Sequence, residues 1–236
     1  MKKVLQKYIA DTGLCSRRQA EKLISDGSVM VNKTKAKLGD RVEDNDLIEI
    51  NGKRLVLKKK LIYIKLNKPI GYTCTNRKFE KEKNVFALVS LKERLFVAGR
   101  LDKNSRGLVV LTNDGDFANK LTHPRYEHYK KYEVIVAERK TRNVQREINV
   151  IKELKKGVDI GEGDGVVKAK EARYLRDDVY EIVLGEGKKR QIRRMLKEIG
   201  FDVVDLVRRE MGRIKLGDLK EGEYKHLSSS EIRINR

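Results

Sequence analysis

The chain has 236 residues, with 55 Lys and Arg against 35 Asp and Glu, so its formal net charge is +20 and its pI is about 9.8. This charge points to a polyanionic partner, and a hydrophobic content of 39% excludes an intrinsically disordered chain. Because no apolar run approaches the roughly 18 residues of a membrane span and the N-terminus lacks a signal-peptide core, we expect a soluble, cytoplasmic protein.

The first elements predicted along the chain are two helices. Apolar residues recur at helical spacing over Val4–Ile9, and Gly13 supplies a C-terminal stop. Ser16 and Gln19 have the spacing of a capping box, which predicts the start of a second helix, and Gly27 predicts its end.

Short strands follow these helices. Alternating apolar residues predict strands within residues 28–32 and 47–50, so the two helices are expected to dock on a small sheet. The basic run at residues 54–60 is the best candidate for a linker. We therefore predict a small α/β domain at residues 1–60 and a second domain at residues 61–236.

Two arginines of the second helix occupy an unusual place. Arg17 and Arg18 lie in its first turn, where the helix dipole disfavours cations. They are either solvated surface charges or ligands that join free amides in holding phosphate oxygens. Lys22 and further nearby lysines (Lys2, Lys3 and Lys7) favour phosphate binding.

The first region resembles the small RNA-binding domain shared by ribosomal protein S4 and several RNA-modifying enzymes, also called the alpha-L motif. The matching segments are residues 5–9, 13–24, 27–32 and 39–42. The resemblance implies that the helical face, with Arg17, Arg18 and Lys22, binds structured RNA and contributes no chemistry.

The second region predicts an α+β fold. Its strand candidates are rich in β-branched residues, and its helix candidates follow a helical period. The predicted strands lie at residues 61–66, 95–98, 108–111, 132–137 and 179–184, and the predicted helices at residues 116–121, 144–156 and 189–199. Many strands beside few long helices indicate a mixed, mainly antiparallel sheet flanked by helices.

The segment Gly99–Leu108 carries the clearest chemistry. It is a polar loop between two predicted strands. Asp102 within it is either a residue whose side chain stabilises a turn or a catalytic carboxylate. Residues 99–116 resemble the active-site motif of the ribosomal RNA pseudouridine synthases of the RsuA, RluB, RluE and RluF type. The resemblance implies that Asp102 is the indispensable catalytic residue and that the fold is of the pseudouridine synthase type.

Three further segments match that family in order. Residues 66–71, with Lys68, are similar to the opening strand and turn of its catalytic domain, residues 130–134 to its second motif and residues 187–195 to its third. The resemblance implies that Tyr132 packs against the target base and that Arg193 pairs with the carboxylate of Asp102. It adds Leu206 as an apolar floor under the uracil, and Lys68 and Arg190 as substrate-binding residues.

These residue types suit the isomerisation of uridine to pseudouridine. The reaction breaks the glycosidic bond from nitrogen and remakes it to carbon 5 of the same uracil, so one carboxylate can suffice. Asp102 would act either as a nucleophile on the anomeric carbon or as a base on the ribose. Tyr132 and Arg100 could offset the cost of flipping the nucleotide out of its stack, although an aromatic residue on a strand is more often core packing.

No cofactor or metal is expected. Cys15 and Cys74 are too far apart, and three histidines too few, for a metal site, and the Gly-rich segment at residues 161–165 lacks the spacing of a phosphate-binding loop. The segment predicts a hairpin turn instead.

The predicted partner is structured ribosomal RNA, with the large subunit favoured and a transfer RNA left open as a second substrate. The protein is expected to act as a monomer and without a membrane. Two other classes of protein share some of these features: a non-catalytic RNA-binding or ribosome-assembly factor, and a DNA-binding regulator. Asp102 argues against the first, because an anion hinders pure phosphate binding, and the strand-rich second region argues against the other.

Overall fold

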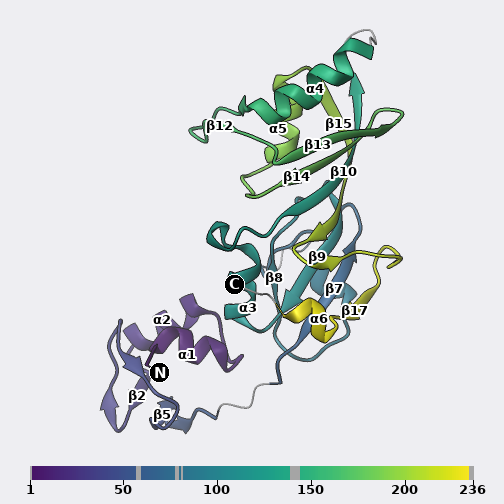
Figure 1. The fold of residues 1–236 in the computed structure, drawn as a ribbon. Coiled ribbons are helices and arrows are strands. Elements are labelled where there is room, and N and C mark those ends of the chain that lie inside the picture. Colours follow the sequence, from purple (N-terminus) through teal and green to yellow (C-terminus); the bar gives the residue numbers. More distant parts are fainter. Residues whose placement is uncertain (1, 57–59, 78–79, 81, 139–143, 234–236) are drawn as a thin grey trace. The chain divides into compact units, whose positions relative to one another are not determined.

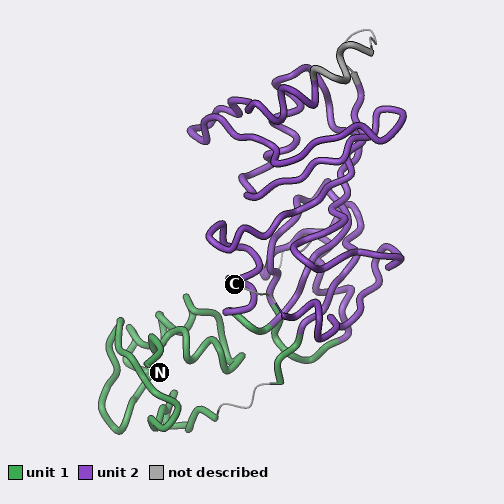
Figure 2. Tube along the Cα trace, in the orientation of Figure 1, with its two compact units in different colours: residues 1–62, 91–95, 113–115 green, residues 63–90, 96–112, 116–236 purple. Residues whose placement is uncertain are grey.

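A computed structural model describes residues 2–56, 60–77, 80, 82–138 and 144–233 (Figure 1). The chain divides into two compact units, which are described separately (Figure 2). The first unit comprises residues 1–62, 91–95 and 113–115, and the second comprises residues 63–90, 96–112 and 116–236. The predicted division after residue 60 stays a prediction, and residues 57–59 of the predicted linker lie outside the described residues. Within the described ranges, no helix is long and apolar enough to cross a membrane.

The first unit consists of two helices and short antiparallel strands. The helices are α1 (Leu5–Asp11) and α2 (Arg17–Ser25). Four strands form a sheet in the order β3-β2-β5-β6, and β1 pairs with β4. The strands are β1 (Lys3–Val4), β2 (Val29–Val31), β3 (Thr34–Lys35), β4 (Arg41–Val42), β5 (Ile48–Ile50) and β6 (Lys53–Arg54).

The sequence signals of this unit are confirmed. Ser16 and Gln19 form a capping box at the start of α2, with the Gln19 amide donating to Ser16 Oγ at 3.2 Å. Gly13 and Gly27 follow the two helices with φ of +85° and +73°, a conformation that favours glycine. The apolar stripes of both helices meet the sheet in one core, whose members include Leu5, Tyr8, Ile9, Ala20, Ile24, Val29, Ile48 and Ile50.

The second unit is built on a nine-stranded sheet. The main path has the order β13-β14-β10-β15-β9-β7-β17, with β16 paired to β15 and β8 paired to β9. These strands are β7 (Tyr63–Lys68), β8 (Phe96–Ala98), β9 (Arg106–Thr112), β10 (Lys130–Glu138), β13 (Glu171–Arg176), β14 (Val179–Leu184), β15 (Phe201–Met211), β16 (Ile214–Lys215) and β17 (Tyr224–His226). Its pairs are antiparallel except that of β9 with β15, so the predicted mixed, mainly antiparallel sheet is confirmed.

Helices flank this sheet. Figure 1 shows α4 and α5 beside the part formed by β13, β14 and β10, and α3 and α6 near the other end. The helices are α3 (Gly115–Thr122), α4 (Val144–Lys156), α5 (Gln191–Glu198) and α6 (Ser229–Ile232), with short 3-10 turns at Val85–Leu88 and Pro124–Tyr126. A core around β8, β9, β15 and α3 buries Leu108, Val110, Phe117, Leu121, Val207 and Met211, among others.

Two details refine the sequence predictions. The third predicted helix starts two residues late, at Gln191, because Arg190 has a left-handed backbone with φ of +51°. The Gly-rich segment forms the expected hairpin, since it joins β11 (Val158–Asp159) to β12 (Val166–Val167), which pair antiparallel. The long strand β15 was not predicted.

Candidate active site

A cavity of about 740 Å³ opens in the second unit, a size that suits a nucleotide. Segments far apart in the sequence line it. They are residues 73–75, 99–105, 122–124, 130–132, 184–193 and 206–208, although not every residue of each range contributes. Among the described residues that line the cavity, Asp102 is the one carboxylate, and eight are cationic: Arg100, Lys103, Lys130, Lys188, Lys189, Arg190, Arg193 and Arg208.

The loop that carries Asp102 connects β8 to β9. Gly99 begins it with φ of +78°, and a Cβ atom there would lie 3.0 Å from the sulfur of Met211, so the turn needs glycine. The amide of Ser105 donates to the carbonyl of Asp102 at 3.1 Å and closes the loop, leaving the Asp102 side chain partly exposed at the cavity.

Cationic side chains hold the backbone of this loop. Arg208 donates from Nη2 to the carbonyl of Gly99 at 2.6 Å and from Nε to that of Leu108 at 2.8 Å. At the other end of the loop, Arg193 Nη2 donates to the carbonyl of Asn104 at 2.7 Å. The carbonyls face cations, so the loop that presents Asp102 is anchored at both ends.

Lys68 contacts the backbone of this loop and does not line the cavity. Its side chain is fully buried, and Nζ donates to the carbonyls of Pro69 at 3.0 Å, Lys103 at 3.3 Å and Ser105 at 2.5 Å. The predicted substrate-binding role therefore needs correction, because three main-chain carbonyls already occupy this amine. Burial is the main reason that the pKa of Lys68 falls from 10.5 to about 8, an effect that nearby Asp102 opposes.

Arg193 lines the cavity, but it does not form the expected ion pair with Asp102 in this structure. Its Nη1 donates to the carbonyl of Val203 at 2.9 Å, and Nη2 also reaches Ser105 Oγ at 3.4 Å. Nε is buried and has no hydrogen-bond partner within the described part of the chain. Burial and then Arg190 lower the pKa of Arg193, whereas Asp102 raises it, so the two charges interact without direct contact.

Tyr132 and Leu206 line the cavity from neighbouring strands. Tyr132 is 7% exposed on β10 and Leu206 is 5% exposed on β15. The register between these strands shifts between Lys131 and Tyr132, and such bulges can re-aim a side chain. Tyr132 is thus both packed in the sheet and part of the cavity wall.

Arg100 and Arg190 are exposed and line the cavity. The left-handed backbone of Arg190 separates the cationic residues 188–190 from α5, so they belong to a loop and not to a helix face. Gln191 supports this loop, since its Oε1 accepts from the amide of Lys188 at 3.0 Å and its Nε2 donates to Glu186 at 3.1 Å.

Three polar residues at the cavity were missed by the sequence analysis. Gln191, Arg208 and Lys130 are buried, at 3%, 1% and 7% exposure, and each lines the cavity. For Arg208 a signal existed, because it lies two positions after Leu206 on the same strand and therefore on the same face.

The predicted RNA-binding residues Arg17, Arg18 and Lys22 lie in the other unit. All three are exposed on α2. Arg17 and Arg18 occupy the first turn of that helix, after the Ser16 cap, where the sequence analysis placed them.

In the described part of the chain, no cluster of three or more His, Cys, Asp or Glu side chains could hold a metal ion. The chemistry that the cavity offers comes from one carboxylate, an aromatic ring and cations suited to phosphate. This set suits an enzyme that binds a nucleotide through its phosphates and acts on it with a carboxylate as base or nucleophile.

Comparison with known proteins identifies the class of this enzyme. Residues 62–198 match the family described as RNA pseudouridylate synthase, and residues 5–48 match the S4 domain. The chain therefore belongs to the RNA pseudouridylate synthase family, isomerases that convert uridine to pseudouridine in RNA. The resemblance inferred from the motifs is thereby confirmed for both regions.

Similar proteins cover nearly the whole chain. The dual-specificity RNA pseudouridine synthase RluF of Escherichia coli strain K12 is 35% identical over 97% of this chain and 76% of its own length. An uncharacterized RNA pseudouridine synthase of Aquifex aeolicus is 36% identical over 97% of this chain and 91% of its own. A crystal structure of a pseudouridylate synthase superposes with a TM-score of 0.70 at 30% identity and covers 97% of both chains.

Proposed function

We propose that this enzyme isomerises a uridine of ribosomal RNA, in the large subunit or its precursor, with Asp102 as the catalytic residue. The observation that carries the proposal is the isolation of Asp102 as the one carboxylate among eight cations in the described lining of the cavity. A surface that only binds RNA gains nothing from an anion at this place, because phosphates repel it.

In this proposal, different cavity residues bind the phosphates, stack on the base and carry out the reaction. The cations, among them Arg100 and Arg190, attract the phosphates on either side of the target, and Tyr132 stacks on the everted uracil above Leu206. Asp102 then acts as a nucleophile on C1′ of the ribose or as a base on the sugar. The N1–C1′ bond breaks, a C5–C1′ bond forms, and N1 gains a proton as C5 loses one.

The first unit supplies RNA affinity in this proposal. S4 domains and the cations of α2 suit structured RNA, so the unit would select the region of RNA that the cavity modifies. The E. coli relative is named for dual specificity, so this proposal includes a second RNA substrate, and a transfer RNA is the candidate that the sequence left open. A ribosomal RNA substrate also favours a cytoplasmic enzyme, and a cavity whose described lining comes from a single chain suits action as a monomer.

Replacement of the catalytic carboxylate tests the proposal. Asp102→Asn keeps the shape of the side chain but removes the charge and the nucleophile, so we expect pseudouridine formation to fall by at least about 10³-fold while RNA affinity stays within about threefold. The measurements are chemical mapping of pseudouridine in total RNA, with and without the enzyme, and a binding titration.

Asp218→Asn is the matched control, because Asp218 is exposed and does not line the cavity. It should leave the rate unchanged. Full activity of Asp102→Asn would overturn the catalytic assignment, and pseudouridine found only outside ribosomal RNA would overturn the substrate assignment.

A further inference from the structure

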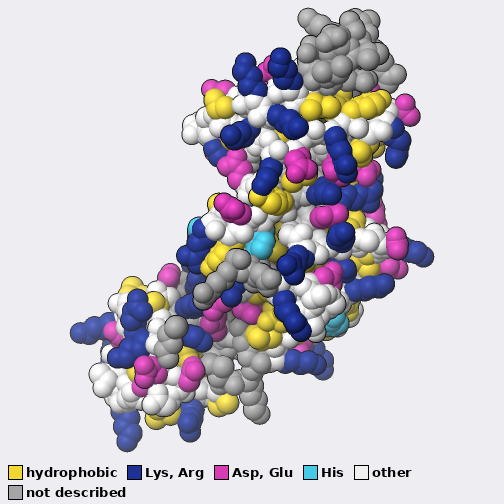
Figure 3. Space-filling model, viewed as in Figure 1, with side chains coloured by type: hydrophobic (Ala, Val, Ile, Leu, Met, Phe, Trp, Pro, Cys, Tyr) yellow, Lys and Arg dark blue, Asp and Glu magenta, His cyan; other side chains and the backbone are white. Residues whose placement is uncertain are grey.

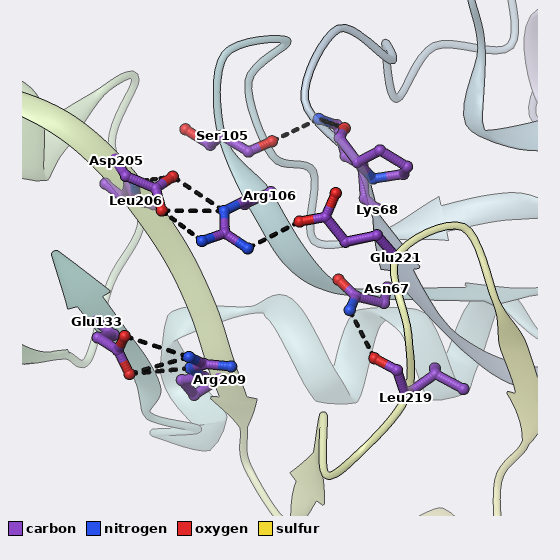
Figure 4. Close-up of polar contacts among 11 residues, drawn as sticks. Asn67, Lys68, Ser105, Arg106, Glu133, Asp205, Leu206, Arg209, Leu219 and Glu221 are labelled. Carbon is purple, nitrogen blue, oxygen red and sulfur yellow. Dashed lines mark hydrogen bonds and ion pairs between the residues drawn. The ribbon is translucent and has the colours of Figure 1, made fainter. Parts of the chain in front are cut away.

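Arg106, the first residue of β9, lies outside the cavity lining but is joined to it by a chain of contacts (Figure 4). Its Nε donates to Asp205 Oδ2 at 2.9 Å and its Nη2 donates to the same oxygen at 2.6 Å, while Nη1 donates to Glu221 Oε1 at 2.7 Å. Asp205 Oδ1 in turn accepts from the amide of Leu206 at 2.9 Å. Arg106 is therefore bound to the residue next to the predicted floor of the cavity.

The ion pair of Arg106 with Glu221 is weaker than its pair with Asp205. The side chain of Glu221 is 46% exposed, against 14% for Asp205, so solvent screens its charge. The segment that carries Glu221 is nevertheless held in place, because Asn67 donates to the carbonyl of Leu219 at 2.6 Å and accepts from the amide of Gly222 at 2.8 Å.

The guanidinium groups of Arg106 and Arg193 both connect residues 104–106 with residues 203–205 of β15. Arg106 belongs to the first segment and binds Asp205 in the second. Arg193 reaches the same pair of segments, with Asn104 on one side and Val203, two residues before Asp205, on the other. Arg193 consequently lies near two carboxylates, Asp102 in the loop and Asp205 on the strand.

One nitrogen of the Arg193 guanidinium, the buried Nε, makes no hydrogen bond within the described residues. Both Asp102 and Asp205 raise the pKa of Arg193 against the dominant effect of burial, so both interact with its charge. If Asp205 had no partner, its largely buried carboxylate would pair with Arg193, because a buried charge without a partner is costly.

We propose that Arg106 is a positioning residue that occupies the Asp205 carboxylate and so leaves Arg193 available to Asp102. The inference rests on the proposed catalytic role of Asp102. A purely structural tie between β9 and β15 is already present in the backbone pairs of Arg106 with Val207 and Gly107 with Arg208, so the guanidinium chiefly compensates charge.

Paired substitutions test this role by rescue. Arg106→Met should slow single-turnover pseudouridine formation at saturating RNA by about tenfold or more, with RNA affinity within about twofold, because Asp205 then takes Arg193 from Asp102. Asp205→Asn in the same chain removes the competing charge and should restore the rate to within about threefold of the single Asp205→Asn variant. Arg106→Lys keeps the cation and should fall between the wild type and Arg106→Met.

Arg209→Met is the matched control. Arg209 lies on β15, the strand of Asp205, and forms a similar pair with Glu133, with contacts of 3.1 and 3.2 Å (Figure 4), but it does not line the cavity. Its loss should leave the rate unchanged. A wild-type rate in Arg106→Met would overturn the proposal, and so would a double variant as slow as Arg106→Met, which is the result expected of a mere structural tie.

A second readout needs no RNA and separates this inference from the proposed function. The ¹⁵Nε resonance of Arg193, recorded on the full chain, should move in Arg106→Met and return in the double variant. A resonance that does not respond to Arg106→Met would overturn the inference even if the enzyme is active. Failure of the wild type to form pseudouridine, with the resonance behaving as expected, would overturn the proposed function alone.

Discussion

At the scale of single residues, the site depends on cations that bind main-chain carbonyls. Lys68 and Arg208 donate hydrogen bonds to main-chain carbonyls of the loop at residues 99–105 and not to a carboxylate. Both side chains are almost fully buried, and such burial is tolerated because each donor has an acceptor. The result is a fixed loop among cations, which holds Asp102 in place at the cavity.

Lys68 makes this support dependent on pH. Its pKa is lowered to about 8, so the amine loses its proton as the pH rises through that value, and with it one of the three donors that hold the carbonyls. We expect the rate of pseudouridine formation to decline above about pH 8. Lys68→Met should be slower at neutral pH but should lack this decline, which a pH–rate profile at saturating RNA would reveal.

The effect of the same group on stability has the opposite sign. Between about pH 8 and 10.5 the folded chain binds fewer protons at Lys68 than the unfolded chain, so this group alone makes the free energy of unfolding rise with pH across that window. A fall in activity that merely followed global unfolding would contradict the proposed cause, and thermal unfolding at each pH separates the two.

At the scale of elements, the site depends on one parallel contact in an otherwise antiparallel sheet. β9 follows the loop that carries Asp102 and β15 carries Leu206 and Arg208, and the two strands pair only at Arg106–Val207 and Gly107–Arg208. At Gly107 the strands approach so closely that a Cβ atom would lie 2.5 Å from the carbonyl oxygen and 2.7 Å from the nitrogen of Arg208. Both are backbone atoms, which cannot move aside as a side chain can.

Gly107→Ala should therefore destabilise the second unit strongly. The clash adds to the strain of φ at +102°, and we expect a loss of roughly 3 kcal/mol or more in the free energy of unfolding. Denaturant titration measures the change. Gly163→Ala is the control, because Gly163 also has a positive φ, of +77°, but nothing lies within 4 Å of its added Cβ. It should cost only about 1 kcal/mol, and equal losses in the two variants would refute the close-contact explanation.

At the scale of the whole molecule, positive charge is shared by both units. The face shown in Figure 3 carries Lys and Arg side chains over each of them. The net charge of +20 therefore suits an RNA that both units bind, each through its own cations. The exposed arginines of α2 allow the share of the first unit to be measured separately from catalysis.

Replacing Arg17 and Arg18 together by Ala should weaken RNA binding and flatten its salt dependence. Each lost phosphate contact removes about 0.7 to 0.9 from the slope of log K against log salt, so a decrease of between about 1 and 2 is expected. The pair Lys53→Ala and Arg54→Ala removes two exposed cations from β6 of the same unit and should change the slope less. Equal effects of the two double variants would indicate general attraction and not recognition by α2.

Local signals in the sequence predicted much of this protein. The capping box at Ser16, the glycine stops and the period of apolar residues predicted α1, α2, α4 and seven of the 17 strands that the described residues form, because these signals act within a few residues of the chain. The motifs and the family resemblance also named Asp102, Tyr132, Arg193, Arg100, Arg190 and Leu206 as site residues. The structure brings all six to one cavity, while their roles stay predictions.

Only the tertiary structure decided which partner each charged side chain takes. Lys68 was expected at the substrate but donates to the loop carbonyls, and Arg193 was expected on Asp102 but binds the backbone. No sequence signal indicated that Arg106 binds Asp205. Periodicity and propensity describe neighbours along the chain, whereas these contacts join residues 35 to 99 positions apart. Packing brings such residues together and decides whether a cation meets water, a carbonyl or a carboxylate.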